Sequence, residues 1–123
     1  MNIKEKAVAL HTGGRNCAQC VLAACGDYTD LDEKTALAVA SGFGGGVRCG
    51  EICGAISGAV MAIGLAKSDD TSASVASLTK LTTAAFREKF GAVRCLDLKR
   101  AGVSCDDLIA FGAQIAEKMI TGD

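Results

Sequence analysis

The chain has 123 residues, the length of one ordinary domain, and its 13 basic and 14 acidic residues leave a formal net charge of −1. A chain of this length buries roughly two-thirds of the surface that it exposes when unfolded, so a core can form without disulfide staples. The charge balance argues against a dedicated nucleic-acid or anionic-membrane surface, and a single histidine excludes chemistry that needs several imidazoles. Seven cysteines remain, and we expect any chemistry to depend on them.

The first residues carry no apolar run of the kind found in secretory leaders, so we expect a cytoplasmic protein. A reducing compartment disfavours structural disulfides, and an odd number of cysteines fits poorly with a closed disulfide framework. The longest uncharged run, 52–66, is shorter than the ~20 residues that span a bilayer, so we expect a buried helix and no membrane partner.

Helical periodicity recurs along the chain, and no useful length alternates with the period of two that is typical of strands. Asn16 is a good cap for the second helix, and Asp30 with Glu33 resembles a capping box for the third. Asp69 or Asp70 is expected to cap the long fifth helix. We predict one all-α domain over residues 1–123, a compact bundle of five to seven helices. The predicted helices cover residues 3–11, 17–25, 31–41, 51–66, 70–90, 95–100 and 105–120.

Three cysteines stand at predicted helix N-termini: Cys17, Cys53 and Cys105. Unpaired backbone N–H groups and the positive end of the helix dipole favour the thiolate there, and Arg94 favours it at Cys95. The thiolate is the form that binds metal, carries a cluster or attacks a disulfide. This placement therefore predicts thiolate chemistry at these four positions.

Cysteine spacing suggests a second arrangement. Cys17 and Cys20 are three residues apart and Cys49 and Cys53 four apart, so two pairs, each on one helical face, could close a four-thiolate zinc site. Zinc ribbons place such pairs on turns with short intervals between them, so zinc is the alternative rather than the favoured metal. Val21 stands where covalent haem attachment needs a histidine, so we expect no haem.

Glycines gather on both sides of Cys49 and Cys53. Because glycine has no side chain, backbone can pass close to a group held by these cysteines, and Gly44, Gly45 and Gly54 are the candidates for contact with a cofactor. Gly54 also begins a stripe of small residues spaced by four. Such a stripe permits close packing of a neighbouring helix, or of a second copy in a homodimer.

An ordered set of motifs surrounds the central cysteine. Residues 53–58 read CGAISG and form a CGAxxG signature. NCAQ at 16–19 and SGFGGG at 41–46 precede it, and Cys95 and Cys105 follow it. With this set, nearly the whole chain resembles the bacterial redox-active family named C_GCAxxG_C_C after its cysteine pattern.

The resemblance implies a ligand set and a cofactor. The family's four cysteines correspond to Cys17, Cys53, Cys95 and Cys105, which we expect to bind a metal or cluster, with Cys49 as an additional or alternative ligand. The same domain is similar to part of the split-Soret cytochromes, which carry an iron–sulfur cluster beside their haems. That kinship implies a cluster in this chain without the haem.

Three functions follow as hypotheses. The first is a small electron carrier that binds an iron–sulfur cluster and exchanges electrons with an unknown partner protein. The stretch 80–100 has six basic and two acidic residues and is the candidate docking region for an acidic partner. The second is a cofactor-free thiol–disulfide oxidoreductase, in which Cys53 would be the attacking thiolate and Cys17, Cys95 or Cys105 the resolving thiol, with Cys53 and Cys17 as the first choice of catalytic pair. The third is a zinc-stabilised interaction module without redox function.

Overall fold

The structure, a computed structural model, describes residues 1–122. These residues form nine helical segments and no strand, so the predicted all-α class is confirmed, and the predicted number of five to seven helices is too low. The segments are α1 (Ile3–Thr12), α2 (Cys17–Ala24), α3 (Gly26–Thr29), α4 (Glu33–Val39), η1 (Gly46–Gly50), α5 (Gly54–Lys67), α6 (Val75–Phe90), α7 (Cys95–Arg100) and α8 (Cys105–Thr121).

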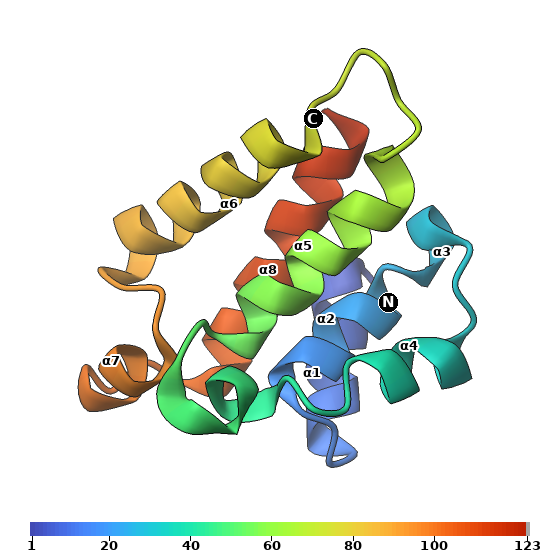
Figure 1. Ribbon diagram of the computed structural model, residues 1–123. Coiled ribbons are helices and arrows are strands. Elements are labelled where there is room, and N and C mark those ends of the chain that lie inside the picture. Colours follow the sequence, from blue (N-terminus) through green and yellow to red (C-terminus); the bar gives the residue numbers. More distant parts are fainter. Residues whose placement is uncertain (123) are drawn as a thin grey trace.

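Helices α2, α5 and α8 form the centre of the fold (Figure 1). Small residues line their contacts: a Cβ built on Gly58 would lie 2.7 Å from the carbonyl oxygen of Ala18, and one on Gly112 would lie 3.0 Å from that of Ala55. The three backbones therefore approach closely. All three helices begin at the same end of the bundle (Figure 1), which brings their first residues together.

The other helices surround this centre. Helix α1 packs against α8 and α2, α4 against α2, α6 against α5 and α8, and α7 against η1. Phe86 of α6 is fully buried and meets Phe111 of α8 edge-on, with ring centroids 5.0 Å apart. Such a pair adds about 0.5–1.5 kcal/mol to the stabilisation from burial, and here it stabilises the packing of α6 against α8. No helix within residues 1–122 is both long and apolar enough to cross a membrane.

Three of the predicted helix starts are wrong. The core helix begins at Gly54 and not at residue 51, because Ile52 pairs through its backbone with Arg94. The third predicted helix begins after Asp32, whose side chain caps it, because Asp30 adopts a left-handed conformation at the end of the short helix α3. The long helix begins after Ser74. Asp69 and Asp70 stand in the turn that precedes it, where the Asp70 side chain accepts hydrogen bonds from Ser72.

Segment η1 contains most of a left-handed turn, which the sequence patterns do not predict. Four consecutive residues, Gly45, Gly46, Val47 and Arg48, have positive φ angles of 63, 64, 56 and 62°. Glycine takes such angles freely, whereas a side chain crowds its own backbone there. A Cβ on Gly46 would also lie 2.4 Å from the backbone nitrogen of Glu51, so this position requires glycine.

Candidate functional site

Four cysteines stand at helix starts. Cys17 is the first residue of α2, Cys95 of α7 and Cys105 of α8. Cys53 is the cap residue directly before α5. The predicted N-terminal placement of Cys17, Cys53 and Cys105 is confirmed, and Cys95 shares it. Because α2, α5 and α8 begin at one end of the bundle, residues far apart in sequence meet there (Figure 1).

The four thiols are close enough to influence one another. The Cys17 thiol lies near the thiols of Cys105 and Cys53, and both raise its pKa. Cys53 in turn lies near Cys95 and Cys105. We call Cys17, Cys53, Cys95 and Cys105 the thiol cluster. Its members come from four different helix starts, so the fold and not local sequence brings them together.

Burial decides the ionisation of the two innermost thiols. Burial raises the pKa of Cys53, whose residue is only 2% exposed, and the N–H groups of Ala55 and Ile56 oppose this shift only in part. Burial also raises the pKa of Cys17, and the neighbouring thiols of Cys105 and Cys53 add to the shift. The prediction that helix starts favour the thiolate is therefore wrong for Cys17 and Cys53, because desolvation and mutual repulsion outweigh the helix dipole.

A short antiparallel backbone pairing holds Cys53 beside Cys95. The N–H of Cys53 donates to the carbonyl of Val93 at 2.9 Å, and the N–H of Cys95 donates to that of Glu51 at 2.6 Å. The Glu51 carboxylate also pairs with Arg94 at 3.1 Å. This contact could not be predicted from the sequence, because three-residue segments are too short to show the period of two that is typical of strands. The opposite charges of Glu51 and Arg94 were the feature of the sequence that could have indicated this contact.

Asn16 positions the start of α2 and therefore Cys17. The Asn16 side chain accepts the N–H of Gln19, and the Gln19 side chain accepts the N–H of Asn16, both at 2.9 Å. Asn16 Nδ2 also donates to the carbonyl of Ser41 at 3.1 Å, and a Cβ on Gly44 would lie 2.7 Å from that of Asn16. The predicted cap is confirmed, and the same side chain holds the glycine-rich loop against the site.

Gly54 allows Cys53 to lie beside Cys17. A Cβ on Gly54 would lie 3.1 Å from the Cβ of Cys17, so a side chain there would push α5 away from α2. The stripe of small residues is therefore used inside the chain, and the predicted homodimer would need another surface. Contact of Gly44, Gly45 and Gly54 with a cofactor stays a prediction.

The three remaining cysteines lie in other settings. Cys20 and Cys25 are fully buried, and burial raises the pKa of Cys20 to about 11 and that of Cys25 to about 12. Cys49 is exposed on η1 and donates to the carbonyl of Gly46 at 3.5 Å. The predicted helical face shared by Cys49 and Cys53 is wrong, because η1 ends before α5 begins. Ligation by Cys49 stays a prediction.

Comparison with known proteins places the chain in a family. The model of the C_GCAxxG_C_C family, described as "Putative redox-active protein", matches residues 15–119. The chain belongs to the C_GCAxxG_C_C family. This finding confirms the resemblance that the ordered motifs indicated. No curated protein and no solved structure matches the chain.

The C_GCAxxG_C_C thiol cluster has the donor chemistry of iron–sulfur and zinc sites, since both are held by cysteine thiolates. Within residues 1–122, no three His, Cys, Asp or Glu side chains are arranged to hold a metal ion in this conformation. The four thiols nevertheless supply the type of donor atom that both groups use.

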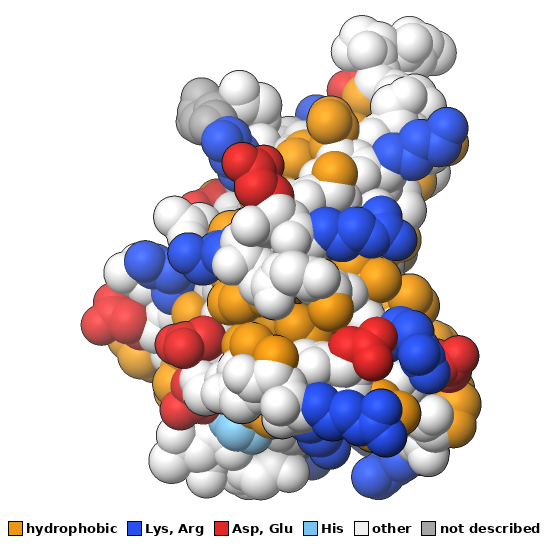
Figure 2. Space-filling model, turned by 90° about the vertical axis from the view of Figure 1, so that its left-hand side faces the viewer, with side chains coloured by type: hydrophobic (Ala, Val, Ile, Leu, Met, Phe, Trp, Pro, Cys, Tyr) orange, Lys and Arg blue, Asp and Glu red, His pale blue; other side chains and the backbone are white. Residues whose placement is uncertain are grey.

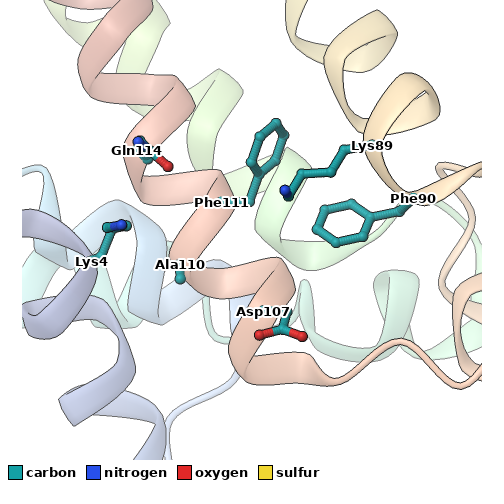
Figure 3. A pocket seen from close by; sticks show the side chains of 7 residues that line it. All are labelled: Lys4, Lys89, Phe90, Asp107, Ala110, Phe111 and Gln114. Carbon is teal, nitrogen blue, oxygen red and sulfur yellow. The ribbon is translucent and has the colours of Figure 1, made fainter.

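A separate hollow of about 420 Å³ lies between α1, α6 and α8 (Figure 3). Lys4 and Lys89 line it from opposite sides, together with the rings of Phe90 and Phe111. The Lys89 ammonium lies 5.5 Å from the centroid of the Phe111 ring and 5.8 Å from that of Phe90, so it covers the aromatic pair. No cysteine lines this hollow, which is therefore distinct from the thiol cluster.

Proposed function

We propose that this protein is an electron carrier in which Cys17, Cys53, Cys95 and Cys105 hold an iron–sulfur cluster. The observation that carries the proposal is the meeting of four thiols from four helix starts at one partly buried place. Iron–sulfur clusters are usually held by four cysteine thiolates. When bound, the cluster would supply the one-electron chemistry that the side chains of this site lack.

The raised pKa values of the clustered thiols favour a positively charged occupant of this site. Thiolates that lie close together repel one another, and burial penalises each of them, which is why the pKa of Cys17 and of Cys53 is raised. Iron or zinc supplies the charge that lets such thiols release their protons. The N–H groups of Ala55 and Ile56 already face the sulfur of Cys53, and hydrogen bonds of this kind help to set a cluster's potential.

The contact between Cys17 and Cys105 favours a second candidate, thiol–disulfide exchange without a cofactor. One thiolate would attack a disulfide of a partner, and the other would resolve the mixed disulfide. Two thiols of this chain would then become one disulfide, and the partner's disulfide would become two thiols. The raised pKa of Cys53 argues against its predicted role as the attacking group, because little thiolate forms near pH 7.

Anaerobic purification followed by metal and sulfide analysis tests the proposal. We expect a brown protein with iron and acid-labile sulfide in stoichiometric amounts. Colourless, iron-free protein that shows a reversible two-electron thiol titration would overturn the proposal in favour of the second candidate. Tightly bound zinc without a redox response would identify a structural site instead.

A further inference from the structure

Exposed apolar side chains gather beside the thiol cluster. Val47 of η1, Ile52 two residues after the end of η1 and Leu96 of α7 are 50, 40 and 37% exposed. Segment η1 packs against α7, where a Cβ on Gly50 would lie 3.1 Å from that of Leu96. Ile52 pairs through its backbone with Arg94, which stands two residues before Leu96. The three residues thus stand on neighbouring segments, and we call the exposed side of these segments the η1–α7 face.

Val47 is held in a backbone conformation that its side chain disfavours. Its φ of 56° and ψ of 40° lie in the left-handed region, where a β-branched residue is an outlier that reduces stability. Because half of the residue is exposed, burial within the chain offsets little of this strain. Glycine would suit the turn better. A partner that covers the Val47 side chain would explain why valine stands there.

Cations border the apolar side chains of this face. Arg48 follows Val47, and Lys99 and Arg100 stand three and four residues after Leu96, on the same side of α7. These three cations are exposed and take part in none of the ion pairs formed within residues 1–122. Figure 2 views the side of the molecule that carries α6 and α7, where hydrophobic side chains lie among both basic and acidic ones. The two acids nearest to this face, Glu51 and Asp97, are paired with Arg94.

We propose that the η1–α7 face docks an acidic electron-transfer protein, which would place carboxylates around an apolar contact. This proposal rests on the proposed function, because an iron–sulfur cluster held by the thiol cluster beside this face would be the group that exchanges electrons with the partner. A second copy is a poor occupant. A two-fold contact would bring Arg48, Lys99 and Arg100 towards the same cations of the other copy, and like charges repel.

Binding to probe proteins of opposite charge tests this docking. The probes are an oxidised acidic flavodoxin and a basic cytochrome c, each titrated calorimetrically into the purified protein at low and high salt. We expect the flavodoxin to bind and salt to weaken its binding, while cytochrome c does not bind. Binding is measured without electron transfer, so its failure is distinct from a failure to find iron.

Charge reversal locates the docking surface. The double variant Arg48→Glu/Arg100→Glu should weaken flavodoxin binding at low salt by about tenfold or more, because two cations of the face become anions. The matched control is Lys34→Glu, an exposed residue of α4, which should change the affinity by less than about twofold. Helix α4 and helix α7 lie on opposite sides of the molecule (Figure 1).

Val47→Gly separates docking from a structural role. It should weaken flavodoxin binding by about fivefold, the effect of losing a modest interface contact, while the unfolding temperature stays equal or rises. A clear fall in unfolding temperature would show that the fold needs this valine. Absence of flavodoxin binding at low salt, equal binding of cytochrome c, or an equal effect of Lys34→Glu would overturn the proposal.

Discussion

Cys53 and Cys25 are both buried thiols with a raised pKa, yet they lie in different surroundings. Cys53 precedes a helix and lies near the thiols of Cys95 and Cys105, which belong to two other helices. Cys25 follows α2 within the apolar core, and its charged neighbour is Glu117. Burial and a raised pKa alone therefore do not distinguish the two thiols. The difference is that thiols from separate helices lie near Cys53.

Alkylation of the native protein should separate the cysteines most strongly. With iodoacetamide at pH 8, we expect Cys49 to react at least about 1000-fold faster than Cys25, because Cys49 is exposed whereas Cys25 is fully buried with a pKa raised to about 12. Mass spectrometry of the cysteine peptides measures the rates. Guanidinium should abolish the difference, and equal rates in the native protein would show that the core around Cys25 opens readily.

Two glycines of α5 test whether close packing assembles the site. Gly58→Ala should reduce the free energy of unfolding by about 3 kcal/mol, because its Cβ would lie 2.7 Å from the carbonyl oxygen of Ala18. Gly64→Ala is the matched control: nothing lies within 4 Å of its Cβ, and alanine should stabilise the helix by roughly 0.5–1 kcal/mol. Urea unfolding measures both, and equal stabilities would refute the close approach of α2 and α5.

Alkaline pH should weaken the fold through its core thiols. Burial raises the pKa of Cys20 to about 11 and that of Cys25 to about 12, from an ordinary value of 9.0. The unfolded chain therefore loses these protons first as pH rises, and their contribution to stability declines from about pH 9 upwards. Urea unfolding between pH 7.5 and 10.5 should show a steeper decline for the wild type than for Cys25→Ala. Identical slopes would contradict this account.

Much of the fold could be predicted because its signals are local. Helix periodicity, the Asn16 cap and the cysteines at helix starts each depend on a few neighbouring residues. The helix caps of α4 and α6 were predicted wrongly because the contacts that decide them are not local. Several aspartates compete to cap α4 and α6, and the choice of Asp32 and Ser74 depends on the path of the chain through α3 and the turn before α6.

The site was harder to predict than the helices. Motif order singled out the four cysteines that meet in the thiol cluster, but the backbone pairing that places Cys53 beside Cys95 joins segments about forty residues apart. The left-handed turn at Val47 and Arg48 contradicts the preference of both residues, so no propensity argument could find it. The raised pKa of Cys17 and Cys53 depends on burial, which a helix-start argument leaves out.

The central claim is that four cysteines hold an iron–sulfur cluster while the core cysteines do not. Its most direct test is the iron and sulfide content of anaerobically purified wild type, Cys53→Ala and Cys25→Ala, with circular dichroism to verify folding. The account predicts bound iron and sulfide in the wild type and in Cys25→Ala, and neither in folded Cys53→Ala. Iron retained by Cys53→Ala, or absent from the anaerobic wild type, would contradict it.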